Sequence, residues 1–211
     1  MSFSNGRRPV PLPGRPALQV VNYPHSALRH RSKPVRRVDA ELKSMIRQMF
    51  DLMYANKGVG LAANQVALPL RLFIVNLEGD PAKGQEMIFI NPVSSQPKGS
   101  GEQEEGCLSF PNLFGNVIRP KQVRVNAYDL TGREIDTTLD GMLARVVQHE
   151  IDHLDGVLFV DRMHPTARMK IQDEIEAFDI EFQSQRASGQ YPDEATIQAR
   201  LRELEQRYCL T

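Results

Sequence analysis

The chain has 211 residues, of which 41% are hydrophobic and 25% charged, and its 26 basic and 26 acidic residues give a formal net charge of zero. This length fits one domain with an appendage, and a neutral chain has no electrostatic reason to bind nucleic acid or an anionic membrane. Two cysteines, Cys107 and Cys209, are too few for a disulfide framework, and no apolar run approaches the ~20 residues of a membrane-spanning helix. The composition therefore favours a cytoplasmic protein.

Residues 1–16 contain three arginines, four prolines and no acidic residue, so we expect a disordered tail, with a short organellar targeting remnant as the alternative. Extended structure, a strand or an arm, should begin near Leu18 and end at Pro24. A helix capped by Asp39 is predicted over 40–55. Its apolar side chains form one stripe at helical spacing, and they are Leu42, Met45, Ile46, Met49, Phe50 and Met53.

Short strands should follow, and the apolar and β-branched runs place them at 71–76, 86–91, 122–129 and 133–139. Segments rich in glycine, proline and serine predict loops at 79–85 and 94–103. The remaining helices are expected at 142–154, 166–187 and 193–208. Successive strands between two helices predict an α+β fold with a mostly antiparallel sheet packed around the second helix. The domain should span 17–164, with a helical C-terminal extension of the same domain at 165–211.

The second helix carries the sequence QHEIDH. His149 and His153 leave the same face of this helix, so both imidazoles can reach one metal ion, and Glu150 can reach water on that metal. Two solvated histidines would give the same pattern. However, Met142 and Val146 continue the stripe of the histidines and place it on the buried side. Two buried histidines without a partner would be costly, whereas a metal ion satisfies both.

A catalytic metal site usually has three protein ligands and an open position for water. Cys107 is the best candidate for the third ligand. A lone cysteine is more often a small buried hydrophobe, but the polar, glycine-containing stretch EEGCLS is an unusual setting for one. A thiolate also suits a soft divalent metal.

The segment GVGLAANQ follows the first helix, and read alone it is also compatible with a helix cap and a turn. Its glycines and alanines permit close approach of a substrate backbone. Gln65, at its end, can donate a hydrogen bond to an oxyanion. Beside a metal site, the segment therefore indicates a substrate-binding loop.

The segments GVGLAANQ, EGCLS and QHEIDH, in this order, resemble the three signature motifs of the peptide deformylases. Cys107 also stands midway between Gln65 and His149, as that family requires. The segment YPHSALRHRSKPV, residues 23–35, resembles the family's N-terminal lead-in, and the resemblance covers roughly residues 18–162.

The resemblance implies a metal-dependent hydrolase that removes the formyl group from the N-terminal formyl-methionine of newly synthesised polypeptides, with residues 17–164 as its catalytic domain. One divalent metal ion would be bound by Cys107, His149, His153 and a water molecule. The native metal of the family is typically Fe²⁺, and Zn²⁺, Ni²⁺ or Co²⁺ can also occupy the site.

The resemblance also implies the catalytic roles. Glu150 would act as general base and then as general acid, and the Gln65 side chain and the Leu108 backbone N–H would form the oxyanion hole. Phe114 stands where one large branch of the family has an arginine near the substrate backbone. This difference predicts that the segment after Cys107 holds the peptide in another way.

Substrate binding should use an apolar pocket and two backbone segments. Val59, Met142 and Val146 are candidates for the methionine pocket, with core packing as the alternative reading of these residues. The substrate backbone should pair, as an added strand, with Gly60 and with Glu105–Gly106.

Two other functions fit part of the pattern. A metallopeptidase also uses H-E-x-x-H, but such enzymes generally take their third ligand downstream, whereas Cys107 lies upstream. A structural metal site in a binding module would need four protein ligands, and the sequence offers no convincing fourth. The extension at 165–211 has mixed charges, which favour a solvated helical appendage over a docking element for the ribosome.

Overall fold

A computed structural model describes residues 17–209 of the chain, so the predicted tail at 1–16 lies outside the described residues. The elements in chain order are η1 (Ser26–Arg29), α1 (Ala40–Ala55), β1 (Gly60–Ala62), η2 (Ala63–Val66), β2 (Leu72–Val75), β3 (Met87–Lys98), β4 (Gly101–Cys107), β5 (Phe110–Arg119), β6 (Gln122–Tyr128), β7 (Glu134–Asp140), α2 (Gly141–Leu154), α3 (Phe159–Arg162), α4 (Pro165–Met169), α5 (Gln172–Ala187) and α6 (Glu194–Tyr208). None of the described helices is long and apolar enough to cross a membrane.

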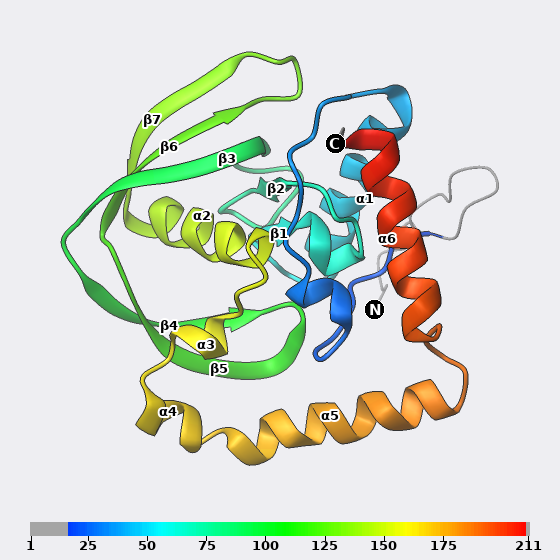
Figure 1. Cartoon of the computed structure of the whole chain (residues 1–211). Helices are drawn as coiled ribbons and strands as arrows, with labels where there is room; N and C mark the ends of the chain where they lie inside the picture. The colour runs from blue at the N-terminus through cyan, green and yellow to red at the C-terminus, as the bar shows by residue number, and fades with distance from the viewer. Residues whose placement is uncertain (1–16, 210–211) are drawn as a thin grey trace, which may run out of the picture.

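The strands form an antiparallel sheet in the order β1-β2-β3-β6-β7 and a separate antiparallel hairpin, β4-β5. Helix α2 lies between this sheet and the hairpin (Figure 1). In β6, Val123, Val125 and Ala127 are buried and alternate with more exposed residues, because successive side chains of a strand point to opposite faces. The predicted α+β class and the central position of the motif helix are therefore confirmed.

Helix α2 is central because apolar side chains cover it toward the sheet. Ala144, Val147 and Leu154 are fully buried and pack in one cluster with Phe73 and Val125 of the sheet. A second cluster packs the methionine-rich face of α1 against β1 and β2. These two clusters fix the sheet between α1 and α2, and so they fix the H-E-x-x-H helix.

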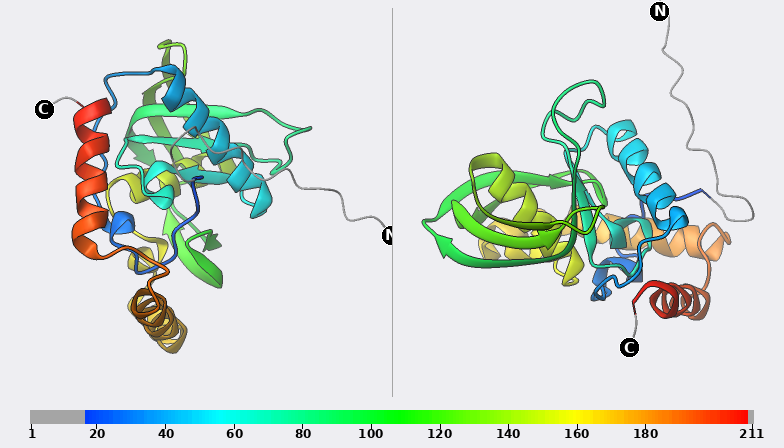
Figure 2. Two further views of the ribbon diagram at one scale, coloured as in Figure 1. Left: turned by 90° about the vertical axis from the view of Figure 1, so that its right-hand side faces the viewer. Right: turned by 90° about the horizontal axis from the view of Figure 1, so that it is seen from above.

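The C-terminal helices pack against this body. In Figure 1, α5 crosses below β5 and α6 turns back along the side of α1, and the further views in Figure 2 show the same arrangement. Ile197 and Leu201 of α6 pack on Ala27 of η1, and Tyr208 is fully buried in the α1 cluster. One face of the predicted extension is thus part of the folded core.

One local prediction is wrong. The segment 94–103 is not a loop, because β3 continues to Lys98 and β4 begins at Gly101. Its side chains are exposed and mostly polar, so it lacks the alternation of apolar and polar residues that marks a half-buried strand. It is held in the strands by backbone hydrogen bonds to neighbouring strands. Of the two alternatives for the segment from Leu18 to Pro24, the structure has the arm, without regular strand structure. Strand β5 was not predicted.

Candidate active site

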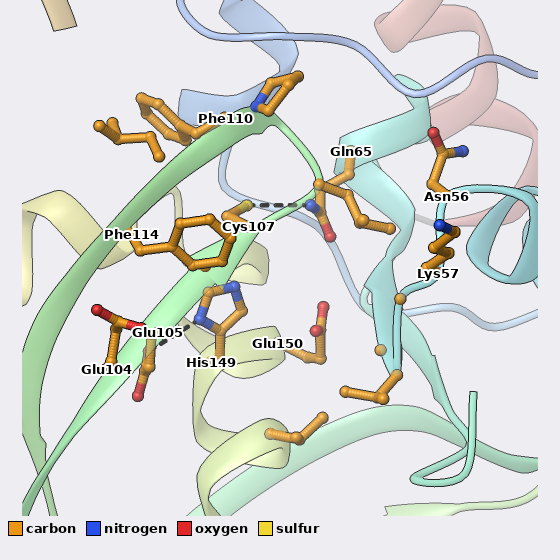
Figure 3. A pocket seen from close by; sticks show the side chains of 18 of the residues that line it. Asn56, Lys57, Gln65, Glu104, Glu105, Cys107, Phe110, Phe114, His149 and Glu150 are labelled. Atoms are coloured by element: carbon orange, nitrogen blue, oxygen red, sulfur yellow. Dashed lines mark hydrogen bonds and ion pairs between the residues drawn. The ribbon is translucent and has the colours of Figure 1, made fainter. Parts of the chain in front are cut away.

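A cavity of about 620 Å³ lies beside α2, between the segment that leads into β1 and the β4-β5 hairpin. Every site residue predicted from the sequence, except His153, lines this cavity. Figure 3 shows Gln65, Cys107, His149 and Glu150 pointing into it from different elements. The three sequence motifs therefore meet around one space.

Three candidate metal ligands converge at one end of the cavity. Cys107 Sγ lies 3.2 Å from His153 Nε2, which lies 3.2 Å from His149 Nε2. One ligand atom from each of the three residues lies within 4.8 Å of the other two. His149 and His153 are one helical turn apart on α2, and Cys107 ends β4. A thiolate and two imidazoles around one point are a suitable ligand set for a soft divalent cation.

The surroundings of His149 orient its ring for a metal. Its Nδ1 lies 3.0 Å from Oε2 of Glu105, which leaves Nε2 to face Cys107 and His153. Metal-bound histidines commonly have such a carboxylate behind them. Arg119 and Arg145 in turn hold Glu105. Although burial alone would raise it, the pKa of Glu105 falls to about 2 because of its bonds to His149 and Arg119.

The electrostatics also fit a bound cation. Burial disfavours a charged imidazole at His149, but the hydrogen bonds with Cys107 and Glu105 raise its pKa to about 10. Positive charge is therefore stabilised at this point. Burial, together with the neighbouring positive charge of His149, lowers the pKa of His153 well below its ordinary value. His153 is thus neutral, which is the form that binds metal, and a metal ion bound at His149 would take the place of the proton there.

Glu150 is the group best placed for proton transfer. It is only 4% exposed, and burial raises its pKa to about 7. Its Oε2 has no hydrogen-bond partner among the described residues. A side chain at Gly60 would place its Cβ 2.4 Å from Oε1 of Glu150, so only glycine leaves room here.

Gln65 has a fixed orientation at the edge of the metal site. Its Oε1 accepts the backbone N–H of Ala62 at 2.9 Å, and its Nε2 donates to Oγ of Ser109 at 3.2 Å. Nε2 also lies 3.4 Å from Cys107 Sγ. Leu108 follows Cys107 and lines the same cavity. Both proposed donors therefore lie next to the metal ligands.

The predicted substrate-binding residues lie in the cavity wall. Val146 is buried, whereas Met142 is 58% exposed and so lies at the mouth, on the first turn of α2. Phe114 is 56% exposed, and its ring covers Gly106, where a Cβ would come within 2.6 Å of it. Phe114 thus gives this side of the cavity an aromatic surface.

Sequence reasoning missed four residues that support this site: Ser109, Arg119, Arg145 and Asp152. Ser109 and Asp152 lie inside the motifs. Asp152 is an acidic residue on a buried helix, and this was a signal that a buried cation must lie next to it. Arg119 is that cation, with its Nη1 2.7 Å from Oδ2 of Asp152. Arg119 and Arg145 carried no such signal, because arginine in a sequence usually indicates surface.

The comparisons with known proteins agree with this geometry. The family model for polypeptide deformylase matches residues 17–169. The chain belongs to the polypeptide deformylase family. It is 47% identical over 191 residues to a peptide deformylase of Rhodopirellula baltica, covering 90% of this chain and 95% of that protein. It is 46% identical to the chloroplastic peptide deformylase 1B of Oryza sativa, covering 70% of this chain and 55% of that protein.

Solved deformylase structures share the fold. A structure of Arabidopsis thaliana peptide deformylase 1B with an inhibitor has a TM-score of 0.76 and 38% identity, covering 84% of this chain and 97% of that one. A peptide deformylase from Legionella pneumophila has a TM-score of 0.71 and 37% identity, covering 84% of this chain and all of that one. The predicted class, a metal-dependent amide hydrolase, is confirmed, and the metallopeptidase alternative is not favoured.

Proposed function

We propose that this deformylase removes the formyl group from the N-terminal formyl-methionine of newly synthesised polypeptides, with Cys107, His149 and His153 holding one divalent metal ion. The observation that carries the proposal is the convergence of these three ligands with Glu150 and Gln65 at one end of a single cavity. A metal-dependent amide hydrolase needs a metal, a base and oxyanion donors at one point, and the cavity brings residues of each type together.

When bound, the metal supplies a Lewis acid that acidifies a water molecule and polarises the formyl carbonyl. Glu150 accepts a proton from the attacking water and gives a proton to the leaving amine. Nε2 of Gln65 and the backbone N–H of Leu108 donate to the carbonyl oxygen as it becomes negative. The C–N bond breaks, and the products are formate and a free N-terminal amine.

Substrate binding follows from two open strand edges. Among the described residues, β1 pairs only with β2, and β4 pairs only with β5. Their other edges flank the cavity at Gly60 and at Glu105–Gly106, where an extended peptide can add as a strand. The side chain of Glu105 bonds to His149, Arg119 and Arg145, so only its backbone serves the substrate. Val59, Met142 and Val146 form the apolar wall for the methionine side chain.

Fe²⁺ is the native metal that we propose, with Zn²⁺, Ni²⁺ or Co²⁺ as replacements, because a thiolate and two imidazoles bind all four ions. The test is to purify the protein without oxygen, count its metals and assay formate release from a formyl-methionyl peptide, with the acetylated peptide as control. Formate from the formyl peptide alone supports the proposal, whereas no formate from a protein that holds one metal contradicts it.

Two substitutions separate the roles. Cys107→Ala should abolish metal binding. Glu150→Gln should keep the metal and lower turnover by ~10²–10⁴, because it removes proton transfer at both steps. A Cys107→Ala protein that still binds one metal ion would favour a peptidase-type ligand set instead.

The cytoplasmic location is part of the proposal, and a ribosomal partner for the extension at 165–211 is the alternative to a solvated helical appendage. Met169, at the end of α4, and Ile180, on α5, are exposed on either side of the buried Ile175, so these side chains can meet a partner. Co-sedimentation of the protein with ribosomes, with and without substitutions of the two exposed residues, tests the partner. Cell fractionation tests the location, since the rice relative is chloroplastic by name.

A further inference from the structure

The N-terminal arm, defined here as residues 18–25, connects two separate elements that carry the proposed oxyanion donors. Gln65 lies in η2, whereas Leu108 lies in the turn between β4 and β5. The backbone N–H of Val21 donates to the carbonyl oxygen of Gln65 at 2.8 Å, and that of Tyr23 donates to the carbonyl oxygen of Ser109 at 2.9 Å. One short stretch of backbone thus bonds to one donor residue and to the neighbour of the other.

These two bonds set the separation of the donors. Gln65 and Ser109 are otherwise joined by the bond of 3.2 Å between their side chains, which is the bond that aims Nε2 of Gln65. Oxyanion donors act only where they are preorganised, and a displacement of ~1 Å can lower a rate by ~10². An arm that holds both backbones therefore acts on catalysis without touching the substrate.

The arm is itself held by α5. The ring of Tyr23 stacks on Phe110, the residue after Ser109, with centroids 4.8 Å apart. Phe110 in turn meets the ring of Phe178 on α5, edge to face, at 5.5 Å. The start of β5 is therefore packed between the arm and the C-terminal extension.

The connection between α5 and α6 holds the other end of the arm. The imidazole of His25 packs edge-on against Tyr191 at 5.6 Å and against Phe182 at 6.1 Å. The phenol oxygen of Tyr191 also has a hydrogen bond with the backbone of Asn22, the residue between the two arm donors. The extension thus contacts the arm between its bonds to Gln65 and Ser109, at Asn22, and after them, at His25.

We propose that the N-terminal arm is a positioning element of the oxyanion hole, and that the C-terminal helices hold it in place through Phe178 and Tyr191. Tyr23 and Tyr191 are positioning residues, since neither lines the catalytic cavity. The inference rests on the proposed roles of Gln65 and Leu108. It assigns the C-terminal extension a task within the enzyme itself, in addition to any external partner.

The experiment is a double-mutant cycle on the metal-loaded full chain. Tyr23→Ala and Tyr191→Ala are each made in the native background and in a Gln65→Ala background, and kcat and KM are measured for formyl-methionyl peptide. We expect each substitution to lower kcat about tenfold in the native background and about twofold or less with Gln65→Ala, because the donor being positioned is then already absent. KM and metal content should change less than kcat.

Conservative and control variants sharpen the result. Tyr23→Phe keeps the stacking ring and should restore kcat, and Tyr191→Phe, which keeps only the ring, should be intermediate. Ile180→Ala, on the same helix as Phe178 but 72% exposed, should change nothing. If the Tyr23→Ala protein does not fold, the cycle is measured with Tyr191→Ala alone. Tyr191 lies in the surface connection between α5 and α6, where a substitution disturbs folding less.

Three results would overturn the inference: the same loss of kcat in both backgrounds, an unchanged kcat in folded protein, or a loss of metal in step with the loss of rate. Failure of the proposed function is a different result. In that case Gln65→Ala alone would leave formate release unchanged, whatever the arm substitutions do.

Discussion

Two groups of arginine–carboxylate pairs hold helices in this enzyme, and their surroundings differ. Behind α2, Arg119 lies 2.7 Å from both Glu105 and Asp152, and these side chains are no more than 10% exposed. At the end of α6, Arg207 lies 3.9 Å from Asp39, and its side chain is 36% exposed. The same residue types are thus used once inside the protein and once at its surface.

The difference teaches which interaction secures each helix. A buried charge that loses its partner keeps its desolvation cost, so the pairs behind α2 are needed once they exist. A surface pair is screened by water and salt and contributes little. Helix α6 must therefore be held by its buried apolar residues, Ile197, Leu201 and Tyr208, whereas the metal-ligand helix depends on buried charge in addition to its apolar packing.

The largest effect should come from Arg119→Met, which leaves two buried carboxylates without their shared partner. We expect a loss of ~3–5 kcal/mol in the free energy of unfolding. Metal affinity should fall by ~10–100-fold, because Glu105 orients His149. Urea unfolding and competition with a chelator measure the two effects. The matched control is Arg124→Met, whose pair with Asp136 is exposed, and equal effects of both substitutions would remove the distinction drawn above.

A smaller effect should follow from Leu201→Ala, which opens a cavity between α6 and η1. Leu201 is 1% exposed, so the loss should be ~2–5 kcal/mol, toward the lower end because α6 lies at the surface and can adjust. The control is Arg202→Met, which is exposed on the same helix, and not Arg207→Met, because Arg207 pairs with Asp39. Thermal unfolding compares them, and a larger loss for Arg202→Met would contradict the apolar account.

Much of this fold was predictable where one signal dominated. The methionine-rich stripe placed the first helix at 40–55, and α1 spans Ala40–Ala55. The motif helix was expected from 142 and begins at Gly141. Both helices bury one continuous face, so their apolar residues recur in the sequence at the spacing of a helical turn. The motifs also identified the residues that meet in the cavity.

The rest depended on contacts that a sequence does not display. The polar segment 94–103 pairs through its backbone. Backbone hydrogen bonds are the same for every residue type except proline, so the side-chain sequence does not reveal them. Arg119 and Arg145 come from β5 and α2, and only the fold brings both to Glu105. The bonds of the arm to Gln65 and Ser109 likewise join main-chain atoms, so no side-chain pattern could announce them.

The smallest effect concerns Asp39, which belongs to the surface group and also caps α1. Its carboxylate accepts the backbone N–H of Leu42 at 2.9 Å, and chiefly this bond lowers the pKa of Asp39 below its ordinary value of 3.8. Since the folded pKa is the lower one, the carboxylate stabilises the fold above the unfolded pKa. That contribution is lost as the pH falls through the folded pKa.

Asp39→Asn separates the cap from the charge. Asparagine caps helices about as well as aspartate, so the free energy of unfolding at pH 7 should fall by only about 0.5 kcal/mol, from the lost charge at the helix start. The difference between the variant and the native protein should then shrink as the pH falls below 3.8 and vanish only below the lowered pKa of the folded carboxylate. Urea unfolding of both proteins in a series of buffers from pH 7 downward measures it. A difference that persists at the lowest pH would show that Asp39 acts through its shape and not through its charge.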